Sequence, residues 1–332
     1  EREIDGIVAY ASDPCAPTAA YVGNKLGLQS NPYESVRTLC NKSQYRAFLK
    51  QNGFNTPEFI EASELNNAIS GVEQLRFPLF VKPNDASGSK GVSQISSITD
   101  LPSAFKHALE FSRCRSVIIE EMVQPEKYQI AGDAFIVGGK VVFHCLANEH
   151  FNLKCNPNVP IGESFPSTLS PGQEDALIEE INRLISALPL EIGAINIDAM
   201  IDKEGQIFLM EIGPRNGGNL IPEVIRLCTG VDLTSYTVEA SLGDQCGNLR
   251  QIPPDGYYSS FIIHSSVGGV YQGLHIDPWL SEKIISKTLL TTPGEKVHPF
   301  NGSQYGLGNM VLRFESKAEI SCAKLGIYYQ AS

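Results

Sequence analysis

Two short, mostly apolar segments, joined by a turn, each carry an acidic residue near the middle, among aliphatic side chains. They cover residues 193–202 and 207–215. If Glu204-Gly205 forms a two-residue hairpin turn, Asp198 faces Glu211 across the strands with Cβ atoms about 5 Å apart. Two facing carboxylates repel in apolar surroundings, so a cation or a shared proton is needed. The pattern predicts a hairpin with an oxygen-only site for Mg²⁺ or Mn²⁺.

Two alternatives remain open for this pair. One carboxylate could form a salt bridge with a nearby arginine, or the strand register could slip so that one carboxylate points outward. The segment directly after the hairpin places Arg215 before a pair of glycines. Its guanidinium is suited to bind a carboxylate or phosphate, and a plain salt bridge is the alternative.

The remaining chain alternates between strand-like and helix-like patterns, which predicts an α/β (α+β) fold. We expect strands at 6–10, 58–61, 77–82, 91–96, 116–121, 258–264 and 310–314. We expect helices at 17–26, 33–40, 42–52, 63–70, 100–112, 173–187, 219–228 and 232–242. A hairpin over 128–147 turns at Gly138-Gly139, and 148–171 is expected to be a loop.

A lysine ends one of the short apolar strands. Lys82 precedes the segment 84–91, which is rich in serine and glycine. A lysine at the end of a buried strand needs an anionic partner, and such a loop offers hydroxyl and backbone N–H groups to phosphates. Neither a Walker loop nor a Gly-x-Gly-x-x-Gly fingerprint occurs. Another strand runs into Glu120 and Glu121 and then a hinge at 122–123 that could read an adenine edge.

Composition limits the partners of the chain. The formal net charge of −11 gives no general attraction to nucleic acid or anionic lipid, and no apolar run reaches the ~20 residues of a membrane span. Eight cysteines without a Cys-x-x-Cys pair predict buried thiols in a reducing cytoplasm. The chain starts without Met or a signal peptide, so we expect a trimmed fragment.

Four motifs in this order resemble the ATP-grasp superfamily, in particular carboxylate–amine ligases similar to D-alanine–D-alanine ligase, L-amino-acid ligases and the carbamoyl-phosphate synthase large subunit. The motifs are Asn41-Lys42 with Arg46, Leu49, Gly53 and Pro57; Val81-Lys82-Pro83 with its Ser/Gly loop; Ile119-Glu120-Glu121; and Asp198 with Glu211 and Pro214-Arg215. The resemblance implies two α/β subdomains that grip a nucleotide.

The resemblance also implies domain limits and residue roles. The limits are 1–34 for the end of a truncated, Rossmann-like preceding domain, 35–245 for the ATP-grasp domain with a lid at about 72–123, and 246–332 for a β-rich extension. The implied ATP contacts are Lys42, Lys82, the lid loop with Ser87 and Ser89, Glu120, Glu121, Met122, Val123 and Glu126. Asp198 and Glu211 would bind Mg²⁺, and Arg215 would steady an acyl phosphate.

The implied activity is formation of an amide from a small carboxylate and an amine, through an acyl phosphate with release of ADP. Two departures keep alternatives open. Gly213 stands where the family usually has Asn, so a second metal is lost or is held by Asn196, Asn216 or Asn219; this favours an MgATP-binding protein without turnover as one alternative. A phosphotransferase is another. In the second departure, the position of the acidic residue that usually binds the ribose falls at Glu126 or, with a different alignment gap, at Lys127.

The substrate side is expected in two polar segments, 148–154 and 162–166. His150 or Lys154 could engage a substrate acid there, and a solvated loop is the alternative. His264 and His298 are expected to be structural, and a homodimer is the default expectation for such an enzyme.

Overall fold

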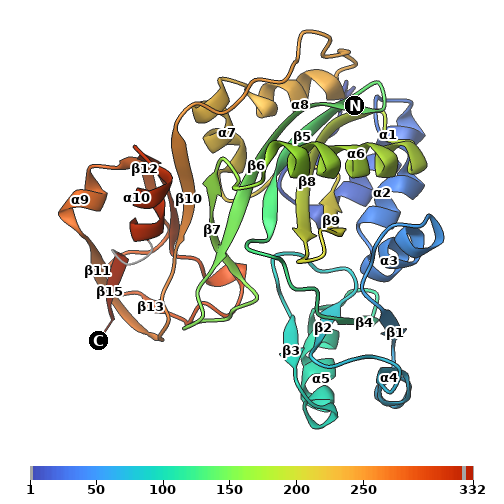
Figure 1. The fold of residues 1–332 in the computed structure, drawn as a ribbon, viewed down its shortest axis with the longest axis horizontal. Coiled ribbons are helices and arrows are strands. Elements are labelled where there is room, and N and C mark those ends of the chain that lie inside the picture. Colours follow the sequence, from blue (N-terminus) through green and yellow to red (C-terminus); the bar gives the residue numbers. More distant parts are fainter. Residues whose placement is uncertain (1–2, 324–326, 332) are drawn as a thin grey trace.

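The computed structural model describes residues 3–323 and 327–331, and it consists of two lobes and a C-terminal layer around one large antiparallel sheet (Figure 1). The large sheet has eight strands in the order β12-β14-β10-β7-β6-β5-β8-β9. Their bounds are β5 Ile130–Val137, β6 Lys140–Phe151, β7 Pro160–Phe165, β8 Ile192–Ile201, β9 Ile207–Gly213, β10 Tyr257–Ile263, β12 Ile284–Leu289 and β14 Gly308–Phe314.

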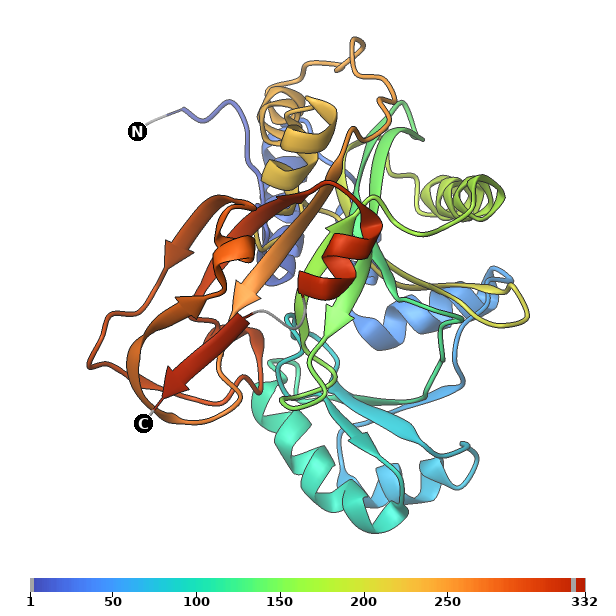
Figure 2. The ribbon, with the colours of Figure 1, turned by 60° about the vertical axis from the view of Figure 1, so that its left-hand side comes forward.

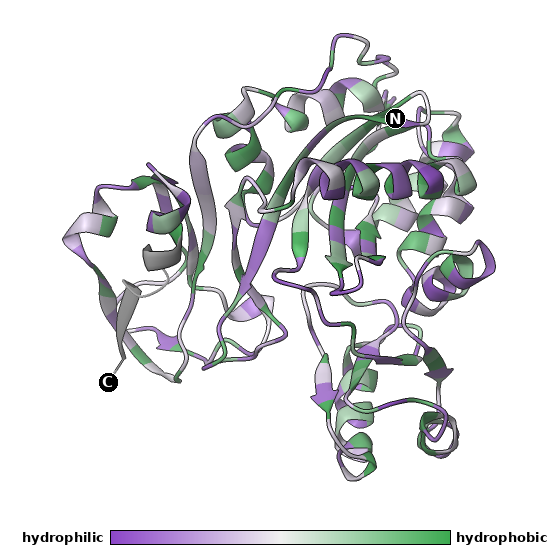
Figure 3. Cartoon of the chain, in the orientation of Figure 1, coloured by the Kyte–Doolittle hydropathy of each residue, from purple (hydrophilic) through white to green (hydrophobic). Residues whose placement is uncertain are grey.

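Helices cover both faces of this sheet because its strands are apolar on both sides. On one face lies α6 (Pro171–Ala187), which begins with a capping box between Ser170 and Gln173 and buries Leu177 and Ile181 against the strands. Green and purple residues alternate along this helix in Figure 3, as expected for an amphipathic helix. On the other face lie α7 (Ile221–Thr229) and α8 (Leu233–Ser241).

The small lobe is a four-stranded sheet with two helices, and Figure 2 shows it below the large sheet. Its strand order is β1-β4-β2-β3. The elements are β1 Phe59–Ala62, α4 Leu65–Val72, β2 Leu79–Pro83, β3 Ser93–Ile95, η2 Ile98–Asp100, α5 Leu101–Phe111 and β4 Val117–Glu121. Buried residues such as Leu79, Phe105 and Ile119 form its core. The lobe is therefore an independently packed layer that brings the ends of β2 and β4 to the large sheet.

The N-terminal segment is helical. Its elements are η1 Asp13–Cys15, α1 Ala16–Leu26, α2 Tyr33–Leu39 and α3 Lys42–Gln51. The expected strand at 6–10 was wrong, because that segment is irregular and pairs with no strand in the described chain. Three-dimensional pairing, and not the apolar pattern alone, makes a strand. The Rossmann-like interpretation of residues 1–34 is not supported by a sheet here.

The C-terminal part joins the large sheet through β10, β12 and β14. A second, three-stranded sheet follows the order β13-β11-β15. The remaining elements are β11 Gly269–Ile276, α9 Pro278–Ser281, β13 Lys296–Val297, η3 Ser303–Tyr305, α10 Lys317–Ala323 and β15 Ile327–Ala331. Strands from both sides of residue 245 in the sequence pair in the large sheet, since β7 pairs with β10. The domain limit expected at residue 245 stays a prediction.

Two further expectations were wrong. The segment 148–171 is not one loop, because β6 continues to Phe151 and β7 occupies Pro160–Phe165. The cysteines are not uniformly buried: Cys145, Cys228 and Cys246 are, whereas Cys15 and Cys114 are exposed. The Cys322 side chain lies outside the described residues. Among the described helices, none combines the length and apolarity that a membrane span requires.

Candidate active site

The predicted pair of carboxylates is confirmed. Asp198 on β8 and Glu211 on β9 occupy directly opposite positions in the ladder. Near the turn the register differs by one residue from the expected one, with Ile201 opposite Ile207. A bulge between Asp198 and Ala199 shifts the register back, so that Asp198 faces Glu211 as expected. The bulge leaves the Met210 carbonyl outside the ladder, where it accepts a hydrogen bond from a side chain described below.

The pKa values of the two carboxyls are shifted in opposite directions, and Glu211 is the one that forms an ion pair with Lys42. Burial and then the Glu211 charge raise the pKa of Asp198 to about 7. Burial would also raise the pKa of Glu211, but the charge and hydrogen bond of Lys42, 3.0 Å away, together with the charges of Arg215 and Lys82, outweigh it and lower the pKa. Asp198 accepts a 2.6 Å hydrogen bond from Gln129 Nε2. A cation between the two carboxyls would remove their mutual repulsion.

These residues fit a divalent cation that is shared with phosphate. Within the described residues, no group of three or more His, Cys, Asp and Glu side chains could hold a metal ion alone. Mg²⁺ commonly takes one or two carboxylates and completes its shell with water and substrate phosphates. The donor set of Asp198 and Glu211 is of this kind, so the pair suits Mg²⁺ in the presence of a nucleotide.

Lys42 is positioned by the start of α3. Asn41 caps this helix by accepting a hydrogen bond from Gln44 N. Besides Glu211, Lys42 Nζ contacts the Ala86 carbonyl of the Ser/Gly loop at 3.0 Å. The backbone N–H of Lys42 donates to the Asn84 carbonyl at 2.9 Å. The helix start and the loop of the small lobe are thus tied together at the lysine.

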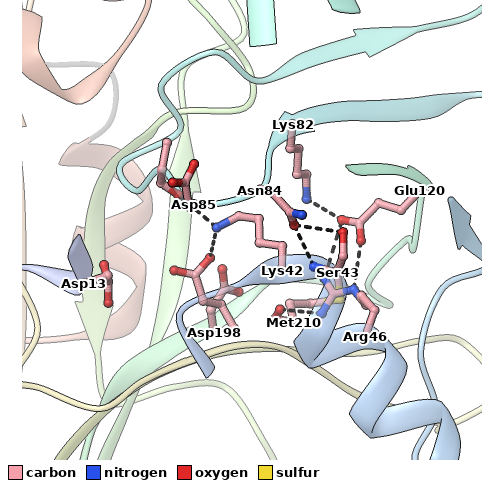
Figure 4. A network of polar contacts seen from close by, with 12 residues as sticks. Asp13, Lys42, Ser43, Arg46, Lys82, Asn84, Asp85, Glu120, Asp198 and Met210 are labelled. Carbon is pink, nitrogen blue, oxygen red and sulfur yellow. Dashed lines mark hydrogen bonds and ion pairs between the residues drawn. The ribbon is translucent and has the colours of Figure 1, made fainter. Parts of the chain in front are cut away.

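A three-residue ion network, centred on a buried glutamate, lies beside Lys42 (Figure 4). Glu120 is 1% exposed and accepts from Arg46 Nε at 2.8 Å and from Lys82 Nζ at 2.6 Å. Arg46 also donates to the Met210 carbonyl at 2.8 Å. Burial alone would raise the pKa of Glu120, but the charges of Arg46 and Lys82 outweigh it and lower the pKa to about 2. Glu120 is therefore ionised and forms ion pairs with both cations.

These residues line a cleft of about 550 Å³ between the two lobes, a volume typical of small-molecule sites. The side chains from the sequence motifs that line it are Lys42, Lys82, Ser87, Ser89, Met122, Val123, Asp198 and Glu211. Ser89 and Gly88 have positive φ angles of 55° and 67°, which bend the loop over the cleft. The structure thus brings together residues from four distant motifs.

Three residues assigned by resemblance lie elsewhere. Glu121, whose backbone the resemblance assigns to the adenine, is not among the residues that line the cleft, and its side chain pairs with the exposed Arg76 at 2.8 Å. Glu126 is exposed and also absent from the lining, whereas its alternative Lys127 lines the cleft. Glu120 contacts its two cations, so a contact between adenine and its carboxylate would compete with them. The nucleotide roles of these acids stay predictions.

Arg215 is held by a residue that the sequence patterns did not reveal. Asp13, from the N-terminal segment, accepts from Arg215 Nε at 2.7 Å and from Nη2 at 2.6 Å. A Cβ at Gly213 would lie 2.7 Å from Asp13 Oδ1 and 3.1 Å from Arg215 Cζ. A side chain at position 213 would therefore have to displace the Asp13–Arg215 ion pair, which fills that space.

Asp133 is a second residue that the sequence patterns missed. It is fully buried, and both of its oxygens accept from Gly217 N, at 3.0 and 2.8 Å. Asn196 Nδ2 donates to the same carboxylate at 2.9 Å. Burial raises its pKa to about 6. The carboxylate orders the glycine turn after Arg215, and the only sequence signal for it is an acid within an apolar strand.

The other expected polar residues are now placed. Asn216 is fully buried, and its Oδ1 accepts from Thr237. His150 lines the cleft and forms a 2.8 Å hydrogen bond with Ser164, whereas Lys154 is exposed and absent from the lining. The structural interpretation of His264 is confirmed, because it is 2% exposed and contacts the Ile262 carbonyl.

His298 and Asn219 complete the set. His298 is exposed and its ring lies against Tyr305, with centroids 5.5 Å apart. The backbone carbonyl of Asn219 accepts from Ser260 Oγ at 3.0 Å. Neither of these two residues lines the cleft.

The fold is similar to that of solved ATP-grasp ligases. The solved L-amino acid ligase from Bacillus licheniformis superposes with a TM-score of 0.81 at 21% identity, over 98% of this chain and 81% of that one. A model of the family described as "D-ala D-ala ligase C-terminus" matches residues 41–229, which is more than half of the 332 residues. The chain belongs to this family.

Curated relatives agree with this assignment. An uncharacterized protein, y4rH, of Sinorhizobium fredii is 26% identical over 247 residues, 72% of this chain and 49% of its own length. The L-arginine-specific L-amino acid ligase of Bacillus subtilis is 22% identical over 310 residues, 91% of this chain and 74% of its own. The chain spans about half the length of the Sinorhizobium relative.

Proposed function

We propose that the protein is an ATP-dependent carboxylate–amine ligase that forms an acyl phosphate and then an amide, releasing ADP and phosphate. One observation carries the proposal: the cleft joins the facing carboxylates Asp198 and Glu211 to Lys42 and Lys82. Two acids and two lysines in one small-molecule cleft suit the phosphates of a metal nucleotide.

In this proposal Lys42 and Lys82 bind ATP phosphates and exchange their present carboxylate partners for phosphate oxygens. Asp198 and Glu211 would hold Mg²⁺, which when bound supplies positive charge that offsets charge on the phosphates. Partial burial of Asp198 strengthens the electrostatic interactions there, because less water screens them than at the surface.

The Ser/Gly loop and the hinge have separate roles. Ser87 and Ser89 offer hydroxyl and backbone donors from a loop that covers the cleft, so they bind phosphate and exclude water. Met122 and Val123 also line the cleft and present apolar surface and backbone groups to a base. Water exclusion matters because water would otherwise capture the acyl phosphate.

Arg215 is proposed to steady negative charge on the reacting phosphate and acyl oxygens. Asp13 holds its guanidinium through two hydrogen bonds and thereby fixes its plane. Asp133 orders the backbone that follows. A fixed cation stabilises developing charge better than a mobile one because no reorganisation is needed during the reaction.

The test is release of ADP from MgATP in the presence of a matrix of carboxylates and amines, beginning with amino acids, with each component omitted in turn. We expect ADP only when both partners are present. The Glu211→Ala variant should lose metal-dependent turnover and keep its fold. Glu180→Ala is the matched control, because it removes an acid paired with Arg183 on α6, outside the cleft lining. Normal turnover of Glu211→Ala would contradict the metal assignment.

A further inference from the structure

A second pair of carboxylates lies on the large sheet, apart from the proposed metal pair. Glu149 on β6 and Glu163 on β7 are directly opposite each other. They are 9% and 7% exposed, and Glu149 lines the cleft. The Oε2 atom of each has no hydrogen-bond partner within the described structure. Like charges directly opposite are destabilising, and an unpaired buried carboxylate is costly, so the pair requires an explanation.

Four protein cations near the cleft are already paired with other acids. These pairs are Lys42 with Glu211, Arg46 and Lys82 with Glu120, and Arg215 with Asp13. Lys90 and Lys127 also line the cleft, but no cation is among the charges that shift the pKa of Glu149. Burial first, and then the charges of Asp198, Glu163 and Glu211, raise the pKa of Glu149 well above its usual range. The local field therefore favours a cation that comes from outside the chain.

The position of the pair connects it to the proposed reaction. Asp198 on β8 lies opposite Ala131 on β5, which lies opposite Ala147 on β6. Glu149 is two residues further along β6, and side chains two apart share one face of a sheet. With strands about 4.8 Å apart, the backbones at Asp198 and Glu149 are about 10–12 Å apart. One small molecule can span that distance along the cleft.

We propose that Glu149 and Glu163 bind the ammonium group of the amine substrate. The inference rests on the proposed ligase function and adds the substrate class: a primary amine that enters the site as a cation. Each orphan oxygen accepts one N–H donor, and a primary ammonium carries three such donors.

An ammonium fits this pair better than a divalent metal does. A divalent metal held by two carboxylates needs further oxygens, such as nucleotide phosphates, to complete its shell. The proposed phosphate-binding lysines pair with Glu211 and Glu120 and not with Glu149 or Glu163, so such phosphates are expected beside Asp198 and Glu211 and not beside this second pair. An ammonium is satisfied by two carboxylate oxygens together with water or substrate atoms.

Direct binding is the first test. We would measure the thermal shift of the protein with propylammonium chloride, with tetramethylammonium chloride and with MgCl₂, at matched ionic strength and without ATP. Propylammonium should stabilise the wild type, and tetramethylammonium, which has no N–H donor, should not. In Glu149→Gln and Glu163→Gln the half-saturating propylammonium concentration should rise at least tenfold. Glu204→Gln, an exposed acid in the β8–β9 turn, is the control and should match the wild type.

Three results would overturn the inference. They are a wild type that binds no propylammonium, variants that bind it as tightly as the wild type, and a site in which these acids bind Mg²⁺ in place of amines. If a Gln variant does not fold, Glu149→Asp, which keeps the charge and withdraws the oxygens, should weaken propylammonium binding in the same direction.

Steady-state kinetics separates this inference from the ligase proposal. In the Gln variants the KM for the amine should rise at least tenfold, while half-saturation by MgATP changes less than twofold. Turnover with an unchanged amine KM would refute the ammonium site and leave the ligase standing. Amine binding that depends on both glutamates, without any MgATP turnover, would refute the ligase and leave the cation site.

Discussion

Replacing Glu163 with glutamine should change how the stability of the protein depends on pH. Burial, followed by the charges of Asp133 and Asp198, raises the pKa of Glu163 from 4.5 to about 8. An acid whose pKa is higher in the folded than in the unfolded state binds its proton more tightly when folded. Its destabilising ionisation is therefore absent below pH 4.5 and complete above pH 8, so stability falls as pH rises through that window.

The magnitude follows from the size of this window. One pKa unit corresponds to about 1.4 kcal/mol, so ionisation of Glu163 lowers the free energy of unfolding by up to about 5 kcal/mol at pH 8 and above. Glutamine has a similar shape and no charge. The Glu163→Gln variant should equal the wild type near pH 4.5 and exceed it by several kcal/mol at pH 8.

Urea unfolding at pH 5, 6, 7 and 8 checks this prediction, with the difference between variant and wild type as the measured quantity. The difference cancels contributions from titrating groups that do not interact with Glu163. The exposed acid Glu204, changed to glutamine, should give a difference near zero at each pH. A Glu163→Gln difference that stays constant from pH 5 to 8 would refute the reasoning, because it would mean that the carboxylate is compensated in the folded protein.

Three further predictions concern the cleft. Gly213→Ala should lower the free energy of unfolding by about 1–3 kcal/mol, since its Cβ would meet Asp13 Oδ1, and Asp13→Ala in the same chain should recover part of the loss; equal melting temperatures would contradict the contact. Lys82→Ala should raise the Kd for MgATP at least tenfold by calorimetry, and an unchanged Kd would remove it from the phosphate site. Glu120→Gln should cost about 3–5 kcal/mol, because it leaves two buried cations without their charge, and thermal melting at the wild-type temperature would refute this.

The central hairpin shows how far local patterns extend. Alternation of apolar residues and the turn residues were sufficient to predict both strands and the facing of Asp198 and Glu211. They were insufficient for the register at the turn, which differs by one residue. The bulge corrects that difference, and its Met210 carbonyl is bonded to Arg46, 164 residues earlier. A contact over that separation has no signature within the hairpin.

Strand β7 was missed for a different reason. It begins with Pro160, contains Gly162 and carries Glu163, and each of these residue types is uncommon in strands. The strand forms because β6 and β10 pair with it on both sides. Its buried glutamate contradicts the usual hydrophobic pattern, and such contradictions are expected at functional sites because function there outweighs stability.

The residues that support the site come from remote segments. Asp13 reaches Arg215 across more than 200 positions of sequence, and Asn84 Oδ1 accepts from both Ser43 N and Ser43 Oγ, at 2.7 and 2.8 Å. The four motifs, taken in their order along the sequence, predicted residues that line the cleft, because lysines and paired acids have a specific chemistry with phosphate and metal ions. Supporting residues are ordinary polar side chains, so only the folded structure identifies them.

The most direct test of the ligase account follows the oxygen of the carboxylate substrate. The substrate identified in the ADP-release matrix is labelled with oxygen-18 in its carboxylate, and the phosphate released during amide formation is analysed by mass spectrometry. Attack of the carboxylate on the γ-phosphate and later loss of phosphate to the amine transfer one labelled oxygen, so each phosphate should carry one oxygen-18 atom. Unlabelled phosphate, released together with amide, would contradict the acyl-phosphate route and the account that rests on it.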